Sequence, residues 1–194
     1  DETVLIPVKY PEYANRLTNL ALLMRNPKRD HDLVALSVVY DDANIDRQRA
    51  EGCKLLEQVT SYAASADVKM HSQLRVATNI ANGIMHAFKE FRATEVVIGM
   101  HMHFSDSTTF WGKFHQSLFN GLSRQIIMAR LMQPLSTLRR IVVCVPSRAQ
   151  FEPGFYRWLE RLSRLAENLD CRIAYHGRQD TLTRIRQYEL NHHE

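Results

Sequence analysis

The stretch from residue 99 to residue 113 contains the residue types best suited to holding an anion. Gly99 and Gly112 can bring backbone N–H groups close to a phosphate, because glycine has no side chain in the way. Lys113 follows Gly112 and would add a positive charge at the start of a helix, where unpaired N–H groups already attract anions. The alternative is that both glycines only form a turn and a helix cap. Two glycines alone are a weak signal for a ligand site.

Histidines lie in the same stretch and suggest two further kinds of chemistry. His101 and His103 alternate, so in an extended segment both rings face one side and could bind a metal together with Asp106. No fourth ligand or cysteine pair accompanies them, so the sequence predicts loop histidines and no metal site. An imidazole titrates near neutral pH, and the same two residues are therefore candidates for pH sensing.

Hydroxyl side chains between residues 105 and 109 resemble a group of nucleophiles. A catalytic serine requires a base within hydrogen-bond reach and an oxyanion hole, and no Gly-x-Ser-x-Gly elbow is present to supply this arrangement. Hydroxyls of this kind commonly form turns and cap helices. The sequence therefore predicts no catalytic residues.

Composition excludes several classes of protein. The chain has 194 residues, of which 45% are hydrophobic and 24% are charged, as in a globular chain of one domain or slightly more. Its apolar runs are shorter than the roughly 18 to 20 residues that a membrane-spanning helix requires. The net charge of +4 is modest and the arginines are scattered, which argues against nucleic-acid binding. Three cysteines, an odd number, argue against a disulfide framework and fit a reducing compartment.

Short continuous apolar runs, typical of buried strands, alternate along the chain with segments whose apolar residues have helical spacing. This alternation predicts the fold. Such an order indicates β-α-β units, and therefore an α/β, Rossmann-like fold with a parallel five-stranded sheet and helices on both faces. Ligands of these folds bind at the carboxyl ends of the strands, which directs attention to the residues after Val8, Tyr40 and Gly99. The predicted strands are 4–8, 33–40, 68–76, 95–99 and 125–129, and the predicted helices are about 12–25, 43–65, 80–91 and 114–122.

The apolar pattern restarts near residue 140 and indicates an internal repeat. A strand at 140–146, a helix with apolar residues from 155 to 169, a strand at 171–175 and a helix start at 181–190 follow the first pattern with an offset of about 137 residues. The second copy stops after strand, helix, strand and helix. We therefore expect a domain at 1–133 and an incomplete second repeat of the β-α-β-α type at 134–194.

The order of elements resembles that of the universal stress protein family. Members carry Gly-x2-Gly-x9-Gly-Ser/Thr after the fourth strand, a spacing that falls on Gly99, Met102, Gly112 and Lys113. The resemblance implies that this loop binds the phosphates of ATP or AMP. It places Lys9 where the family has an aspartate at the adenine end of the nucleotide. Met102 and Lys9 depart from the family pattern, since a side chain at 102 would obstruct the phosphate and residue 9 has the opposite charge.

A more extensive resemblance is to the tandem universal-stress-like region of bacterial sodium/hydrogen antiporters of the monovalent cation:proton antiporter-2 kind. It extends over essentially the whole chain and is carried by residues 110–112, 133–143 and 152–155. The resemblance implies a non-catalytic regulatory domain on the cytoplasmic side of the inner membrane, attached to a membrane antiporter domain that precedes residue 1. It also implies self-association through the sheets.

Two alternative functions stay open from the sequence. One is a stand-alone universal stress protein that binds a nucleotide. The other is a structural dimerisation module, in which the strand at 125–129 pairs across a two-fold axis or between repeats.

Overall fold

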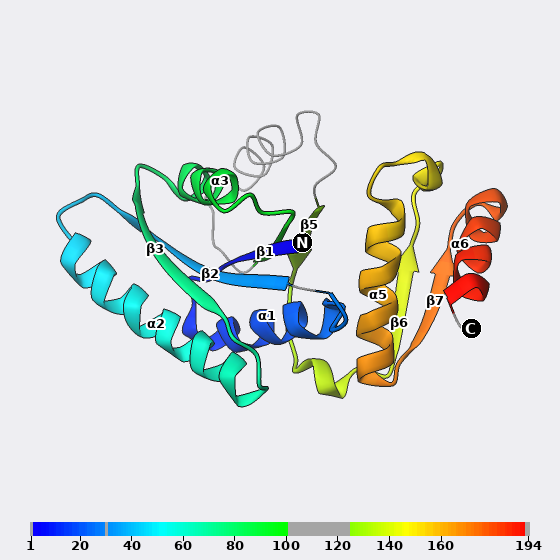
Figure 1. The fold of residues 1–194 in the computed structure, drawn as a ribbon, viewed down its shortest axis with the longest axis horizontal. Coiled ribbons are helices and arrows are strands. Elements are labelled where there is room, and N and C mark those ends of the chain that lie inside the picture. The colour runs from blue at the N-terminus through cyan, green and yellow to red at the C-terminus, as the bar shows by residue number, and fades with distance from the viewer. Residues whose placement is uncertain (1, 30, 101–124, 193–194) are drawn as a thin grey trace. The chain divides into compact units, whose positions relative to one another are not determined.

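The first part of the chain forms a parallel sheet with helices on its two faces (Figure 1). The computed structural model describes residues 2–29, 31–100 and 125–192. Its strands lie side by side in the order β3-β2-β1-β4-β5. The chain therefore adds β2 and β3 on one side of β1 and then β4 and β5 on the other side. The elements are β1 (Glu2–Pro7), α1 (Pro11–Met24), β2 (His31–Tyr40), α2 (Ile45–Ser65), β3 (His71–Ala77), α3 (Ile80–Glu90), β4 (Glu95–Gly99) and β5 (Gln125–Ala129).

This arrangement confirms the predicted α/β, Rossmann-like fold with its five-stranded parallel sheet. Helices α1 and α2 lie on one face of the sheet and α3 lies on the other (Figure 1). The predicted helix at 114–122 falls outside the described residues. The third strand starts at His71 and not at the predicted residue 68, because Ala66 and Asp67 form the turn after α2 and residues 68–70 connect that turn to the strand.

Local chemistry explains where individual elements begin and end. Pro7 is the last residue of β1, a position where its missing N–H does not interrupt the sheet. Pro11 occupies the first turn of α1, where the backbone N–H that proline lacks would have no acceptor within the helix. Helix α3 is capped by Asn79, whose side-chain oxygen accepts a hydrogen bond of 2.8 Å from the backbone N–H of Asn82.

The core on the α3 face is built from β-strand and helix residues that are almost fully buried. Leu5 of β1 and Leu36 of β2 are both 0% exposed, and Phe88 of α3, which packs in the same cluster, is 1% exposed. Burial of a leucine or phenylalanine side chain stabilises a fold by about 1.5–3 kcal/mol. This cluster therefore fixes α3 on the sheet and with it the carboxyl ends of β1 and β4.

The second part of the chain forms a smaller α/β unit. Its elements are η1 (Leu135–Thr137), β6 (Arg140–Cys144), η2 (Ala149–Phe151), α5 (Phe155–Leu169), β7 (Arg172–His176) and α6 (Gln179–His192). Strands β6 and β7 pair in parallel. By contacts, the chain divides into one unit of Asp1–Leu22 and Pro27–Gln133 and another of Leu23–Asn26 and Pro134–Glu194.

Helices α5 and α6 both cover the same face of the β6-β7 pair. Phe155 and Leu159 of α5 share a buried cluster with Ile185 of α6, and the strand residues Val143 and Tyr175 pack against that cluster. Helices α5 and α6 therefore form one layer on this strand pair, as α1 and α2 do on the first sheet (Figure 1).

Candidate functional site

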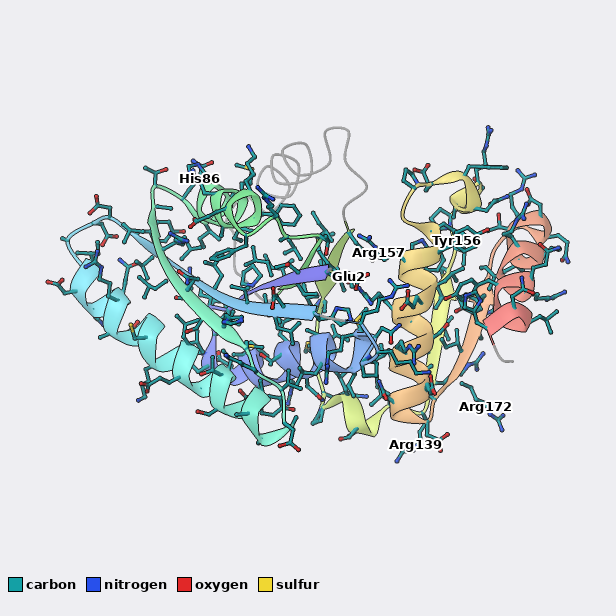
Figure 2. All side chains as sticks on the ribbon, viewed as in Figure 1. Glu2, His86, Arg139, Tyr156, Arg157 and Arg172 are labelled. Carbon is teal, nitrogen blue, oxygen red and sulfur yellow. The ribbon has the colours of Figure 1, made fainter. Side chains whose placement is uncertain are left out.

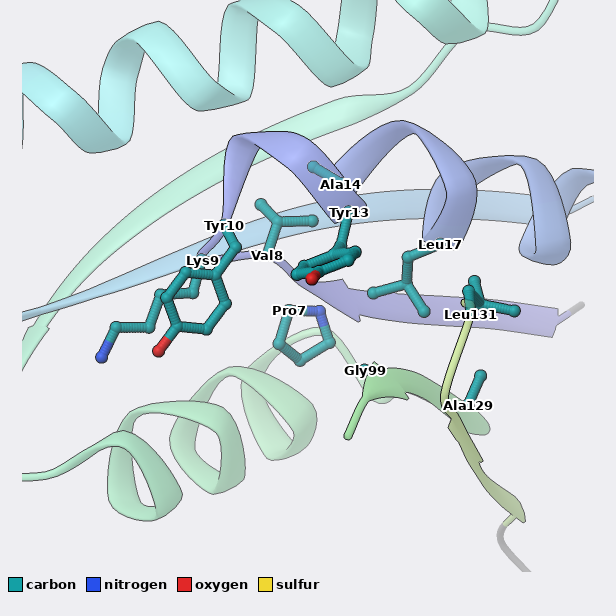
Figure 3. A pocket seen from close by; sticks show the side chains of 10 residues that line it. All are labelled: Pro7, Val8, Lys9, Tyr10, Tyr13, Ala14, Leu17, Gly99, Ala129 and Leu131. Atoms are coloured by element: carbon teal, nitrogen blue, oxygen red, sulfur yellow. The ribbon is translucent and has the colours of Figure 1, made fainter. Parts of the chain in front are cut away.

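A pocket opens at the carboxyl edge of the first sheet, where β1 and β4 lie side by side. The strand order reverses between these two strands, and crevices of this kind are the usual ligand sites of α/β sheets. The enclosed part of the pocket is small, about 30 Å³. Its lining residues come from the end of β1, the first turns of α1 and the ends of β4 and β5: Pro7, Val8, Lys9, Tyr10, Tyr13, Ala14, Leu17, Gly99, Ala129 and Leu131 (Figure 3).

Hydrogen bonds hold the rim of this pocket in place. The N–H of Val8 donates to the carbonyl oxygen of Leu36 at 2.8 Å, which extends the pairing of β1 and β2 beyond Pro7. The N–H of Met100 donates to the carbonyl of Ala129 at 2.8 Å and joins the ends of β4 and β5. Arg16 donates to the carbonyl of Leu131 at 3.1 Å, which ties the residues after β5 to α1. The rim is therefore built from strand ends and a helix start.

The pocket is largely apolar, with aromatic and charged groups at one end. Tyr13, Leu17 and Leu131 line its interior, whereas Lys9 and Tyr10 lie together at one end (Figure 3). An apolar hollow with few polar groups suits the planar or aliphatic part of a ligand better than a row of phosphates. We therefore expect any charged part of a ligand to lie toward Lys9.

Lys9 is the charged residue of this site. Its ammonium nitrogen lies 6.0 Å from the ring centroid of Tyr10 and 5.7 Å from that of Tyr40, within the range of a cation–π interaction. Partial burial lowers the pKa of Lys9. Burial also raises the pKa of Tyr40, with a smaller contribution from Tyr10. Tyr40 is held in position by Gln48, whose side-chain oxygen accepts from the Tyr40 N–H at 2.9 Å.

Gly99 is the last residue of β4 and lines the pocket, as does Lys9. The sequence therefore predicted two residues that the structure brings to one pocket. A Cβ atom at Gly99 would have Leu17 at 3.9 Å and the Ala129 carbonyl oxygen at 4.0 Å as its nearest neighbours, which are ordinary contacts. The fold itself therefore does not require glycine at this position, and an alanine would fit.

The other predicted site residues lie outside the described residues. These are the loop positions Met102, Gly112 and Lys113 and the histidines His101 and His103. Among residues 2–29, 31–100 and 125–192, no three His, Cys, Asp or Glu side chains are placed to share a metal ion.

Sequence reasoning missed the aromatic part of the site. Tyr10, just before α1, and Tyr13 of α1 line the pocket, and Tyr40 at the end of β2 lies near Lys9. The spacing of these residues in the sequence does not predict this. A usable signal did exist for Tyr40, because it ends the second predicted strand at the edge where ligands bind.

Comparison with solved structures assigns the fold. A universal stress protein from Archaeoglobus fulgidus matches with a TM-score of 0.51 at 14% identity, covering 66% of this chain and 98% of that protein. UspA from Lactobacillus plantarum matches with a TM-score of 0.52 at 16% identity, covering 66% and 97%. The chain has the universal stress protein fold. This confirms the resemblance that the sequence predicted, whereas no family model matches the chain.

Two further relatives match across both units and come from transport proteins. The cytoplasmic domain of a prokaryotic cation chloride cotransporter matches with a TM-score of 0.54 at 10% identity, covering 90% of this chain and 65% of that domain. The Na(+)/H(+) antiporter NhaS5 of Synechocystis is 23% identical over 166 residues, which are 83% of this chain. The chain spans 24% of the length of that antiporter. Within the described part of this chain, no helix is both long and apolar enough to span a bilayer.

Proposed function

We propose that this chain is a non-catalytic regulatory domain of a cation transporter, and specifically of a Na+/H+ antiporter. The similarity to NhaS5 over 83% of the chain carries the proposal. The likeness of fold to the cytoplasmic domain of a cation chloride cotransporter, over 90% of the chain, supports the same class. The proposed location is the cytoplasmic side of the inner membrane.

The proposed partners are the membrane domain of the antiporter and a second copy of this chain. Residues 1–133 would serve as a complete universal-stress-like domain and residues 134–194 as an incomplete second repeat. Regulation requires that a signal bind two arrangements of this domain with unequal affinity, since equal affinity leaves their populations unchanged. The domain would then alter exchange in the membrane part without carrying ions itself.

Ion exchange in membrane vesicles tests this function. Sodium-dependent dissipation of a pH gradient is measured in everted vesicles, with the full gene product and with a product from which residues 1–194 have been deleted. We expect the deletion to change the rate of exchange or its pH dependence. Identical exchange from both products, or a gene product without membrane-spanning segments, contradicts the proposal.

Nucleotide binding is the second function that we propose, and the pocket at the β1-β4 switch favours it. The pocket presents an apolar interior for a base and the ammonium group of Lys9 for a phosphate. This orientation differs from the one that the family resemblance implies, in which residue 9 lies at the adenine end. In this proposal ATP or AMP contacts Lys9 and Gly99, together with the loop residues Met102, Gly112 and Lys113. A stand-alone nucleotide-binding stress protein and a dimerisation module are the competing functions.

Isothermal titration with ATP and AMP separates these functions. Gly99→Trp fills the pocket and should abolish binding, whereas Gly99→Ala fits the available space and is the matched control for the fold. Absence of heat with both nucleotides, together with a stable dimer in sedimentation, would favour the dimerisation module.

Sensing of pH is proposed for His101 and His103, two histidines separated by one residue. Histidine NMR titrations between pH 6 and 8 test it, within about one unit of the pKa of a free imidazole. A titration curve that couples either ring to a change at an interface supports the proposal, and its absence for both rings contradicts it.

A further inference from the structure

One wall of the pocket at the β1-β4 switch is the start of the connection to the second unit. Ala129 ends β5 and Leu131 follows two residues later, and both line the pocket. They lie at the end of the pocket opposite Lys9 (Figure 3). The first unit extends to Gln133, and the second unit takes up the chain again at Pro134. Residues 130–133, which we call the connector, therefore lead from the pocket to the second unit.

The enclosed part of the pocket is smaller than a nucleobase requires. Its volume of about 30 Å³ is roughly that of one water molecule in the liquid. Pockets that bury a small-molecule ligand usually measure about 300–1,000 Å³. The planar part of a nucleotide can therefore enter among the lining residues only if one wall moves away.

The connector is the wall best able to move. Leu17 of α1 is 5% exposed, and Gly99 belongs to β4, which pairs with β1 on one side and with β5 on the other. Leu131 is only partly buried and lies beyond the last pair of β4 and β5, which is Gly99 with Ala129. The Arg16 side chain of α1 donates a hydrogen bond of 3.1 Å to the carbonyl oxygen of Leu131. Outward movement of Leu131 would break this bond.

The far end of the connector is fixed in the second unit. Helix η1 begins there with Leu135, which is 5% exposed. The carbonyl oxygen of Leu138 accepts from the Cys171 thiol at 3.3 Å. The carbonyl oxygen of Arg139 accepts from the Arg172 N–H at 3.4 Å, at the end of the unit where β6 and β7 begin (Figure 2). Movement of the connector would therefore be passed to this strand pair.

We propose that a ligand in the β1-β4 pocket displaces Leu131 and so releases the connector to the second unit. The inference rests on the nucleotide function proposed above and states how occupancy of that site is transmitted. Leu131 lines the space that a base requires, and Arg16 holds the connector to α1. The ligand favours the arrangement in which the connector is detached from α1. The two arrangements thus differ in affinity for the ligand, which is the condition for regulation.

Trypsin reports release of the connector, because Arg130 is an exposed connector residue. Cleavage of the native chain after Arg130 is quantified by mass spectrometry. Cleavage after Lys69, in the exposed connection before β3, is the reference for the fold. Native cleavage follows the population of the released form when opening is fast. Gly99→Trp fills the pocket without any ligand and should speed cleavage after Arg130 about fivefold. Gly99→Ala should leave it unchanged, since its Cβ fits the available space.

Arg16→Met tests the same release without filling the pocket. It removes the bond to Leu131 and should speed cleavage after Arg130 about threefold to tenfold, the effect of losing one hydrogen bond. Saturating AMP should also speed this cleavage in the wild type, and it should have no further effect on Gly99→Trp. Cleavage after Lys69 should stay constant throughout. A Gly99→Trp protein that is cut faster at both bonds has lost its fold, and Arg16→Met then decides.

The outcomes separate this inference from nucleotide binding. Unchanged cleavage after Arg130 in Arg16→Met, or in folded Gly99→Trp, overturns the inference whether or not a nucleotide binds. AMP that gives heat in the titration and leaves cleavage after Arg130 unchanged also overturns it, while the nucleotide function stands. Absence of heat, with faster cleavage after Arg130 in both variants, rejects AMP as the ligand and supports the link between pocket and connector.

Discussion

Gly83 of α3 lies directly against Val38 of β2. A Cβ atom at Gly83 would come within 2.5 Å of one methyl carbon of Val38 and 2.9 Å of the other, with the Cβ of Ala77 at 3.2 Å. Valine has a stiff side chain that cannot rotate both methyl groups away. We therefore expect the steric clash in Gly83→Ala to destabilise the protein by about 1–3 kcal/mol. The higher helix propensity of alanine offsets roughly 1 kcal/mol of this loss.

Gly99→Ala is the matched control, because its Cβ would meet only ordinary contacts at 3.9 Å and beyond. Urea unfolding followed by circular dichroism should give a lower midpoint for Gly83→Ala and a midpoint near wild type for Gly99→Ala. Equal midpoints for the two variants would mean that α3 does not approach β2 as closely as described.

The sequence predicted the sheet and most of its elements because their signals are local. The apolar spacing that predicted a helix at 43–65 corresponds to α2 at Ile45–Ser65, and the predicted strand at 125–129 is β5. Periodicity cannot report a close approach such as that of Gly83 to Val38, which depends on how two elements meet after folding. The glycine would be read from sequence only as a weak point in a helix.

Leu5 of β1 pairs with Val34 of β2, Val142 of β6 pairs with Ala174 of β7, and truncating these two strand residues, Leu5 and Val142, should have unequal effects. Leu5 is 0% exposed in the α3 core, so Leu5→Ala should destabilise the first unit by about 2–5 kcal/mol. Val142 is 54% exposed, and Val142→Ala should change stability by less than about 0.5 kcal/mol. Hydrogen exchange of the strand amides measures each unit separately. A large effect of Val142→Ala would show that its face is already covered in the isolated chain.

Tyr175 should make the second unit sensitive to alkaline pH. Burial, followed by the nearby Glu189 carboxylate, raises the pKa of Tyr175 from 10.0 to about 12. Because the folded value lies above the unfolded one, the contribution of the neutral phenol is fully present below pH 10 and is lost as the pH rises through about 12. Tyr175→Phe should therefore lose less stability than wild type between pH 10 and 12.

Unfolding midpoints at pH 8 and at pH 11.5 test this prediction, and the ultraviolet difference spectrum of the phenolate reports the ionisation directly. Tyr156→Phe is the control, since that side chain is 51% exposed, and it should retain the wild-type loss. Equal losses in wild type and Tyr175→Phe would contradict the assignment.

The pocket shows which parts of a site a single sequence reveals. Gly99 and Lys9 were predictable because Gly99 ends one short apolar strand and Lys9 comes just after another, and the carboxyl ends of parallel strands share one edge. Tyr40 lies near Lys9 because β1 and β2 pair in the register Pro7–Leu36, so that β2 continues past the end of β1 alongside the residues that follow it. Register is set by packing over the whole sheet and has no local signature in the chain.

Lys9 should acylate at lower pH than an ordinary surface lysine. Partial burial lowers its pKa, so a larger fraction of the reactive neutral amine is present at moderately alkaline pH. Pulses of acetic anhydride between pH 7 and 11, with quantification by mass spectrometry, give the pH of half-maximal labelling. Lys54, on the exposed side of α2, is the comparison. Coincident half-maximal values for the two lysines would contradict the lowered pKa.

The same assay links Lys9 to the proposed nucleotide. A phosphate beside the ammonium group favours its charged form, so saturating ATP or AMP should move the half-maximal pH of Lys9 upward and leave Lys54 unchanged. Gly99→Trp fills the pocket and should cancel the shift. A nucleotide that slows Lys9 labelling at every pH by the same factor, without moving the midpoint, would act by shielding alone, and its phosphate would not lie against this amine.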